Sequence, residues 1–226
     1  MALQVAARRY NLRMFDLTVS DLIARVIVLV VAFTVHEFAH AYTADRFGDT
    51  LPRAQGRLTL NPLAHLDPLG SLLLVVAGFG WAKPVMINVT ALERRHRAAP
   101  MLVALAGPLS NLVLATLAAI PFQLNLIVMD YRTGGIFPTP FQLLDTFILI
   151  NLVLLFFNLL PIFPLDGEKI LTYFLPPSGK QFMESIRPYG SLILLAAIFV
   201  LPRFGFDLFN YLVWEPVVQV YRLLMG

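Results

Sequence analysis

Long apolar stretches separated by short polar connections are the main pattern of this 226-residue chain. A helix needs about 20 predominantly apolar residues to cross the hydrocarbon core of a bilayer. Four stretches meet this requirement, and we expect each to form a transmembrane helix; they are roughly 20–44, 98–121, 141–160 and 189–212. The fourth is the least regular, because Pro202, Arg203 and Gly205 interrupt it.

A fifth stretch, SLLLVVAGFGWAKPVMINV at 71–89, has an apolar part that is too short to cross. About ten apolar residues precede Gly78, and glycine, proline and β-branched residues follow. This composition favours a re-entrant or interfacial segment that ends in a β-hairpin. The pattern therefore predicts an all-α polytopic membrane protein with about four transmembrane helices and one such segment.

The composition supports a membrane protein. Hydrophobic residues make up 58% of the chain and charged residues 14%, and the mean hydropathy is +0.73. An average soluble domain has about 45–50% apolar and about 25% charged residues. The length suits one compact bundle, so we expect residues 1–226 to form a single membrane-embedded domain. The chain has no cysteine, which excludes disulfides and thiolate metal ligands.

The basic residues indicate an orientation rather than nucleic-acid binding, because they are scattered through short loops. Residues 45–97 contain seven Lys and Arg and residues 166–188 contain three, whereas 122–140 contain one and 203–226 contain two. The positive-inside rule then places 45–97 and 166–188 in the cytoplasm. The N-terminal residues, which contain three arginines, would lie outside, against that rule.

Two histidines and a glutamate lie near the end of the first apolar stretch, in HEFAH at 36–40. On a helix His36 and His40 share one face, with Cβ atoms about 5–6 Å apart, so both imidazoles can bind one metal ion. Glu37 lies one position round the helix, where it is not a ligand but can accept and return protons. An ionisable residue inside a membrane costs at least about 2.5–3.5 kcal/mol, which disfavours a purely structural role. The pattern predicts an intramembrane zinc site.

A catalytic zinc ion normally takes three protein ligands. The candidates for the third, in apolar surroundings, are Asp145, Asp166 and Glu168. We favour Asp166, because Pro161 and Pro164 end the regular helix just before it, and broken helix at membrane depth is tolerated where it lines a cavity. Asp145 lies near the opposite end of the third stretch, some 30 Å away by helix rise.

The order of the spans supports this choice. One full crossing, 98–121, separates the first and third stretches, so it returns Asp166 to the cytoplasmic end, where His36 and His40 lie. A second crossing at 71–80 would put Asp166 on the opposite side. The metal constellation therefore argues that 71–89 does not cross the membrane.

Five motifs together resemble the site-2 protease family of intramembrane zinc metalloproteases. They are HEFAH, NPLAHLDPLG (61–70), GWAKPV (80–85), ALAGPLSN (104–111) and NLLPIFPLDG (158–167), in the order expected for that family. The resemblance implies a metalloprotease with a catalytic core at about 20–175, followed by a C-terminal helical region at 189–226. It implies Zn²⁺ bound by His36, His40 and Asp166, with Glu37 as the general base.

The resemblance also implies a transmembrane protein substrate, cut near the cytoplasmic face of a bacterial or archaeal cytoplasmic membrane. Asn158, directly before the proline-rich break, is the better candidate for substrate binding. Asn111 could serve the same purpose or form a hydrogen bond between helices, and His65 could lie near the site or belong to a structured loop. Glu168 departs from the family, because a small residue usually follows LDG.

Many members of that family carry a PDZ or CBS domain, for which this chain has no room, so we expect access to be controlled either by a regulatory membrane partner or by prior trimming of the substrate. Nothing in the sequence indicates an oligomeric state. The alternative function is a metal-binding membrane transporter or sensor without hydrolytic activity. A transporter should carry polar residues through both halves of the membrane, whereas here they concentrate at the depth of the two metal motifs.

Overall fold

The computed structural model describes residues 18–70, 81–128 and 135–226, and nearly all of its regular structure is helical. Its helices are α2 (Val19–Arg46), α3 (Leu51–Ala54), η1 (Pro62–Ala64), α5 (Val89–Arg95), α6 (Ala99–Gln123), α7 (Pro140–Asn158), α8 (Asp166–Phe174), α9 (Pro177–Ile186), η2 (Arg187–Tyr189), α10 (Gly190–Leu195), η3 (Ala196–Val200), η4 (Leu201–Phe204), η5 (Asn210–Trp214) and α11 (Glu215–Met225). Four helical stretches are long and apolar enough to span a membrane: Val19–Arg46, Ala99–Gln123, Pro140–Asn158 and Pro177–Phe204. The prediction of a helical membrane protein with about four spans is confirmed.

The predicted β-hairpin at 71–89 is not confirmed. Residues 71–80 lie outside the described residues. Residues 81–88, which we term the 81–88 segment, have no regular secondary structure, and Val89 already begins α5. The β-type pairing among the described residues is one isolated antiparallel bridge between Leu66 and Ala82.

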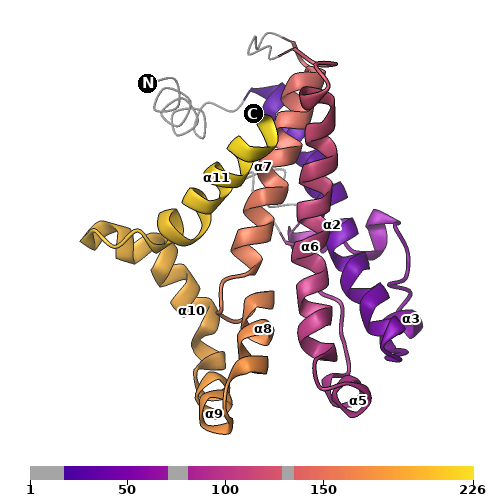
Figure 1. The fold of residues 1–226 in the computed structure, drawn as a ribbon, viewed down its shortest axis with the longest axis vertical. Coiled ribbons are helices and arrows are strands. Elements are labelled where there is room, and N and C mark those ends of the chain that lie inside the picture. The colour runs from indigo at the N-terminus through magenta and orange to yellow at the C-terminus, as the bar shows by residue number, and fades with distance from the viewer. Residues whose placement is uncertain (1–17, 71–80, 129–134) are drawn as a thin grey trace.

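Helices α2, α6 and α7 form a bundle in which each helix packs on the other two (Figure 1). Small residues of α6 face the bundle core, and the fully buried Ala115 and Ala119 belong to the same cluster as Ile148 and Leu152 of α7. Small side chains let helix backbones approach closely, which is how helices associate in a lipid environment. This bundle carries the residues that the sequence singled out.

The beginnings of α2 and α7 are joined at one end of the bundle. Thr18 and Asp21 form a capping box, in which the Thr18 hydroxyl accepts from the Asp21 backbone N–H and the Asp21 carboxylate accepts from Thr18. Gln142 of α7 donates hydrogen bonds to Asp21 and to Ser20. These contacts set the position of α2 relative to α7 at the end of the bundle away from the histidines.

The fourth candidate span differs from its prediction. It begins at Pro177 rather than near residue 189 and ends at Phe204 rather than near residue 212. Polar residues in α9, including Lys180, Gln181 and Glu184, hid its first turns in the hydropathy pattern. After Phe204 the chain reverses, and η5 and α11 return to α7 (Figure 1), where Val213 and Val217 are fully buried.

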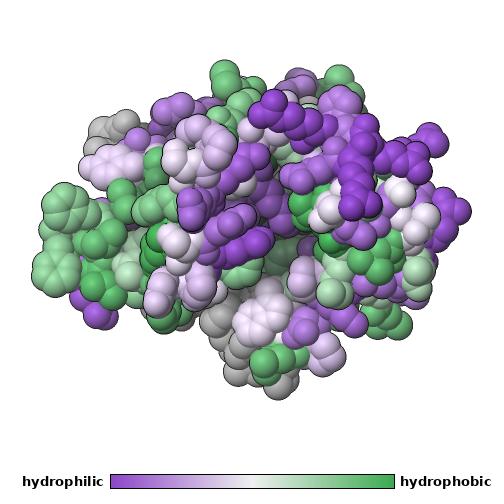
Figure 2. Space-filling model, turned by 90° about the horizontal axis from the view of Figure 1, so that it is seen from below, coloured by the Kyte–Doolittle hydropathy of each residue, from purple (hydrophilic) through white to green (hydrophobic). Residues whose placement is uncertain are grey.

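One end of the molecule is polar. Helices α3, α5, α8 and α9 lie at the lower end of Figure 1, and Figure 2, which views that end, shows hydrophilic side chains gathered across its middle. Apolar side chains are visible towards its margins. This distribution fits a protein whose long helices cross a bilayer and whose polar end, which includes the beginning of the fourth candidate span in α9, lies at one membrane surface.

A hydrogen bond between Tyr221 of α11 and Asp145 of α7 holds the C-terminal helix on the bundle. We expect Tyr221→Phe to lower the free energy of unfolding by about 1–3 kcal/mol, because a partly buried carboxylate loses a donor. Unfolding in detergent checks this, with Tyr211→Phe as the control, because the Tyr211 side chain is 61% exposed. A stability loss in the control equal to that of Tyr221→Phe would contradict the prediction.

Candidate metal centre

Three side chains converge at the end of the bundle where α2 ends and α8 begins. His36 Nε2 and His40 Nε2 lie 3.0 Å apart, and Asp166 Oδ2 lies 3.2 Å from each of them. His36, His40 and Asp166 are 6%, 8% and 8% exposed, so the group is almost completely removed from solvent. The histidines are one helical turn apart on α2, and Asp166 is the first residue of α8.

The donor set fits a zinc ion. Zinc binds histidine nitrogen and carboxylate oxygen at about 2.0–2.2 Å, so two ligands of a tetrahedral site lie about 3.3 Å from each other. The three observed separations, 3.0–3.2 Å, are close to that value. One oxygen and two nitrogens leave a fourth position for water or substrate, as catalytic sites require.

The break between α7 and α8 brings Asp166 to the histidines. Helix α7 ends at Asn158, and α8 starts only at Asp166 after a proline-containing loop. The start of α8 lies directly against the end of α7: a Cβ atom on Gly167 would overlap the backbone carbonyls of Leu159 and Leu160. Glycine is therefore required next to the aspartate for this close approach.

The charge of Asp166 suits metal binding. Asp166 lies outside the four candidate spans. Burial by itself would raise the pKa of its carboxyl, but His40 and His36, when they are protonated and no metal ion is bound, offset this effect and hold the pKa below its usual range. The carboxyl is therefore ionised at neutral pH, the state in which a carboxylate binds zinc.

Each histidine is oriented by a hydrogen bond from its other ring nitrogen. His40 Nδ1 lies 2.7 Å from the backbone carbonyl of Val103, which can only accept, so Nδ1 carries the hydrogen. His36 Nδ1 lies 2.6 Å from Oδ1 of Asn111. In both rings Nε2 is then left unprotonated and faces the other ligands, as metal binding requires.

The direction of the Asn111 hydrogen bond is determined by a chain of contacts. The backbone carbonyl of Phe147 can only accept, so Asn151 presents its amide nitrogen to it, at 2.8 Å. Asn151 Oδ1 then accepts from Asn111 Nδ2, also at 2.8 Å, and Asn111 Oδ1 is left to accept from His36. Both asparagines are fully buried. A backbone carbonyl of α7 thus sets the tautomer of a ring on α2.

Helix α6 passes so close to the site that only glycine fits at position 107. A Cβ atom there would lie 2.6 Å from His36 Nε2 and at comparable distance from the ring of His40. The groups against which this glycine packs are therefore the two imidazoles.

Glu37 is not part of the three-residue ligand group. Its Oε2 accepts a hydrogen bond of 2.9 Å from the backbone N–H of Val85, in the 81–88 segment. The carboxylate thus lies on the same turn as His36 and His40 and is held by a segment from a different part of the chain.

The other sequence candidates lie in different surroundings. Asp145 accepts from Tyr221 and is not in the ligand group. Asn158 donates to the backbone carbonyl of Leu154 within its own helix. His65 is fully buried, and its Nε2 lies 2.7 Å from the carbonyl of Thr59.

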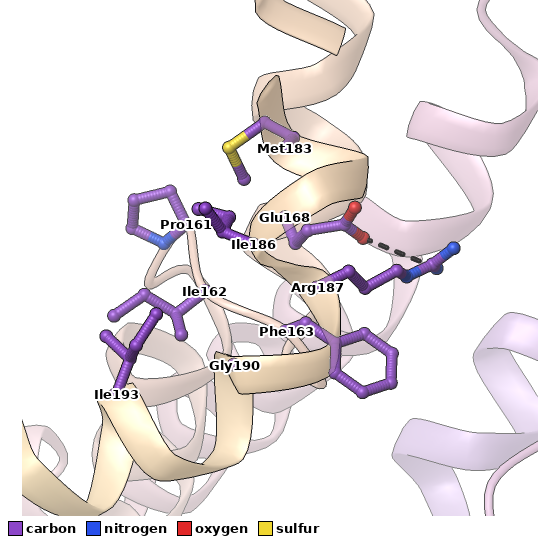
Figure 3. A pocket seen from close by; sticks show the side chains of 9 residues that line it. All are labelled: Pro161, Ile162, Phe163, Glu168, Met183, Ile186, Arg187, Gly190 and Ile193. Carbon is purple, nitrogen blue, oxygen red and sulfur yellow. Dashed lines mark ion pairs between the residues drawn. The ribbon is translucent and has the colours of Figure 1, made fainter. Parts of the chain in front are cut away.

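Glu168 is not in the ligand group and pairs with the C-terminal region instead. Its carboxylate pairs with Arg187 at 3.8 Å, and the Arg187 guanidinium also stacks over the Phe163 ring at 5.0 Å. Figure 3 shows this pair at the edge of a small cavity of about 40 Å³, lined also by Met183 and Ile186. Arg187 thus connects η2 with both the loop before Asp166 and the helix after it. The pair gives the buried Glu168 carboxylate a charged partner in the C-terminal region.

Four features of the site were not identified from the sequence: Asn151, the Val103 carbonyl, the contact of Gly107 with the histidines, and the Val85 amide. Asn151 carried a readable signal, because it is a polar residue inside an apolar stretch, as Asn111 and Asn158 are. The two backbone groups carried none, because any residue supplies them.

The fold and the site define a polytopic membrane protein with a buried metal-binding centre of the HExxH type. The model of peptidase family M50 matches residues 133–201, which include Asp166. A Bacillus subtilis protein named "Putative zinc metalloprotease YwhC" is 43% identical over 87% of this chain and 86% of its own length. A Mycolicibacterium smegmatis protein named "Putative zinc metalloprotease Rip2" is 34% identical over 81% of this chain and 72% of its own length. The chain belongs to peptidase family M50, the site-2 protease family that its motifs resemble. No solved structure matches it.

The hydrogen bond from His36 to Asn111 generates a prediction. Removing a partner that orients a metal-binding histidine typically costs 10–100-fold in metal affinity, so Asn111→Leu should weaken zinc binding by about that factor. Zinc competition against a chelating dye in detergent measures it. Asn158→Leu is the matched control, because Asn158 bonds only within its own helix among the contacts described. Equal affinities in Asn111→Leu and Asn158→Leu would contradict this role.

Proposed function

We propose that this protein is a zinc-dependent intramembrane protease that hydrolyses a peptide bond in or near a transmembrane segment of another membrane protein. The observation that carries the proposal is the buried triangle of His36, His40 and Asp166, beside Glu37, within a bundle of apolar helices. Membership of peptidase family M50 supports it, and so do relatives whose names describe zinc metalloproteases.

In this proposal His36, His40 and Asp166 hold the zinc ion. The bound ion would act as a Lewis acid that polarises the scissile carbonyl and makes water more acidic. Glu37 takes the proton of the attacking water and delivers it to the leaving amine. The Asn111–Asn151 chain and the Val103 carbonyl keep both imidazoles in the tautomer that binds metal.

The substrate is a membrane protein that must unwind locally before it can be cut. A helix holds its carbonyl groups in its own hydrogen bonds, so an attacked bond has to leave helical geometry first. Helix-breaking residues near the cut should therefore promote cleavage. We retain Asn158, Asn111 and His65 as candidates for substrate binding. For Asn111, contact with substrate competes with the hydrogen bond to His36.

The arrangement of the chain in the membrane is part of the proposal. Residues 1–226 form one membrane-embedded domain, with its catalytic core at about 20–175. The distribution of Lys and Arg supports an active site toward the cytoplasmic side of a bacterial cytoplasmic membrane. A re-entrant 71–89 stretch that does not cross is consistent with His36, His40 and Asp166 meeting at one end of the bundle. A transporter or sensor role is not favoured, because the family is one of peptidases.

Metal content tests the ligand set without knowledge of the substrate. We expect about one zinc per chain in the wild type and in Asp145→Ala, but little in Asp166→Ala, because a two-histidine site lacks its third ligand. Elemental analysis of protein purified in detergent measures this. Asp145→Ala is the matched control, since it removes the same group from the adjoining helix α7. Zinc retained in Asp166→Ala would require a different ligand set.

Glu37→Gln separates hydrolysis from metal binding. We expect this variant to keep its zinc and to cleave a transmembrane substrate about 10²–10⁴-fold more slowly, because an amide cannot act as a general base. Cleavage in detergent or liposomes by wild type and variant, normalised to zinc content, checks it. Equal rates in the two proteins would remove Glu37 from the proposed mechanism. A wild type that holds zinc but never hydrolyses would favour the transporter or sensor.

A further inference from the structure

Arg57 is a buried arginine that the proposed mechanism does not use. Its residue exposure is 4%, and it lies between α3 and η1, outside the long helices. Its Nη1 donates to the backbone carbonyls of Ala64 and Lys83, the latter at 3.2 Å, and its Nη2 donates to the carbonyl of Pro84 at 3.4 Å. A buried charge is costly unless it is well hydrogen-bonded, so a buried arginine at this position is expected to have a specific role.

Two further contacts hold the 81–88 segment, one on each side of the Lys83 and Pro84 carbonyls that Arg57 binds. The Lys83 N–H donates to the carbonyl of His65 at 2.7 Å. The Asn88 N–H donates to Oδ2 of Asp49 at 2.6 Å, and Asp49 is only 3% exposed. Two buried charged side chains, Arg57 and Asp49, thus hold a segment that has no regular secondary structure of its own.

The hydrogen bond from Val85 to Glu37 lies between these attachments, and one peptide group connects it to Arg57. The carbonyl of Pro84 and the N–H of Val85 belong to the same peptide unit, which is planar and rigid. Arg57 binds the oxygen of that unit, and Oε2 of Glu37 accepts from its nitrogen. The position of the Glu37 carboxylate is therefore tied to the guanidinium through a single rigid group.

The positive charge of Arg57 also strengthens the hydrogen bond between Val85 and Glu37. A positive group at the carbonyl oxygen polarises the peptide unit and makes its N–H a stronger donor to a carboxylate. The planar guanidinium fork can bond several carbonyls at fixed angles, which a lysine ammonium at the end of a flexible chain cannot reproduce. Arginine is thus the residue type suited to hold Ala64, Lys83 and Pro84 together.

We propose that Arg57 is a positioning residue for the general base, which it orients through the Pro84–Val85 peptide. The inference rests on the proposed role of Glu37 in hydrolysis. Arg57 does not touch the three metal-binding side chains. It keeps one oxygen of the Glu37 carboxylate bound to Val85 and thereby sets the direction of the other.

The test compares Arg57→Met and Arg57→Lys with the wild type on a transmembrane peptide that the wild type cleaves. We expect Arg57→Met to keep one zinc per chain, to change KM little, and to lose about tenfold to hundredfold in kcat, as a misplaced catalytic group does. Arg57→Lys should recover only part of the loss. Arg53→Met is the matched control, because Arg53 lies on the adjoining α3, and its 69%-exposed side chain pairs with Asp45 rather than with the 81–88 segment.

A double-mutant comparison separates positioning from a general loss of structure. If Arg57 acts through Glu37, Arg57→Met should have no further effect on the residual rate of Glu37→Gln, because residues that act as a unit are not additive. Hydrogen exchange provides a readout that does not depend on activity: the Val85 amide should exchange faster in Arg57→Met than in Arg53→Met.

Val85→Pro covers the case in which Arg57→Met does not fold, because it deletes the N–H that binds Glu37 and leaves Arg57 in place. It should reproduce the loss in kcat with zinc retained. Unchanged kcat in a folded Arg57→Met, or in Val85→Pro, would overturn the inference while leaving the proposed function standing. The inference would also be overturned if the losses in rate from Arg57→Met and Glu37→Gln were additive in the double mutant, or if Arg57→Met raised only KM. Glu37→Gln that cleaves as fast as wild type would instead remove the proposed role of Glu37 on which the inference rests.

Discussion

The need to bury three ionisable side chains together at one end of a bundle of apolar helices is the constraint on which the rest of this structure depends. An isolated charged or ionisable side chain at membrane depth costs at least about 2.5–3.5 kcal/mol. His36, His40 and Asp166 are nearly solvent-free, yet each has close polar neighbours. The second ring nitrogen of each imidazole bonds to a group of α6, and a bound zinc ion would offset the charge of the carboxylate. Polar residues are tolerated at this depth because they satisfy one another.

This requirement explains why three helices must meet so closely at one end of the bundle. Helix α2 supplies the histidines, α6 supplies Asn111 and the Val103 carbonyl, and α7 supplies Asn151 and the Phe147 carbonyl. Gly107 lets α6 reach the imidazoles, and Gly167 lets α8 begin against the end of α7. Because Gly107 and Gly167 have no side chain, the helices can approach closely enough to bring the three side chains together from α2 and α8.

The segments outside the bundle serve the same site from the polar end. The 81–88 segment has no strand or helix to fix it, so its backbone groups are held by buried side chains and by the loop at 64–66. In the C-terminal region, Arg187 contacts both Phe163 and Glu168, on either side of Asp166. Side-chain contacts thus hold both the irregular 81–88 segment, which binds Glu37, and the loop that leads into Asp166.

Much of the candidate site was predictable because it is encoded locally. Two histidines four residues apart share a helix face in any helix. Two prolines before Asp166 end a helix through their own chemistry. Long apolar stretches predict spans from hydropathy alone, and three of the four agree closely with the candidate spans. The fourth was misplaced at both ends, because α9 begins with polar residues and the apolar pattern continues past Phe204, where the candidate span ends.

Tertiary structure decided the features that depend on contacts between distant residues. The Asn111–Asn151 chain joins residues 40 positions apart, and the Val85–Glu37 bond joins residues 48 apart. Backbone carbonyls and amides take part in both arrangements, and these groups are the same in every residue, so no side-chain pattern reveals them. The amino-acid sequence by itself determined the metal-binding chemistry and the helices that carry it. Only the packed structure decided which groups orient the two histidines and hold Glu37, because hydrogen-bond partners depend on where the helices and loops come to lie.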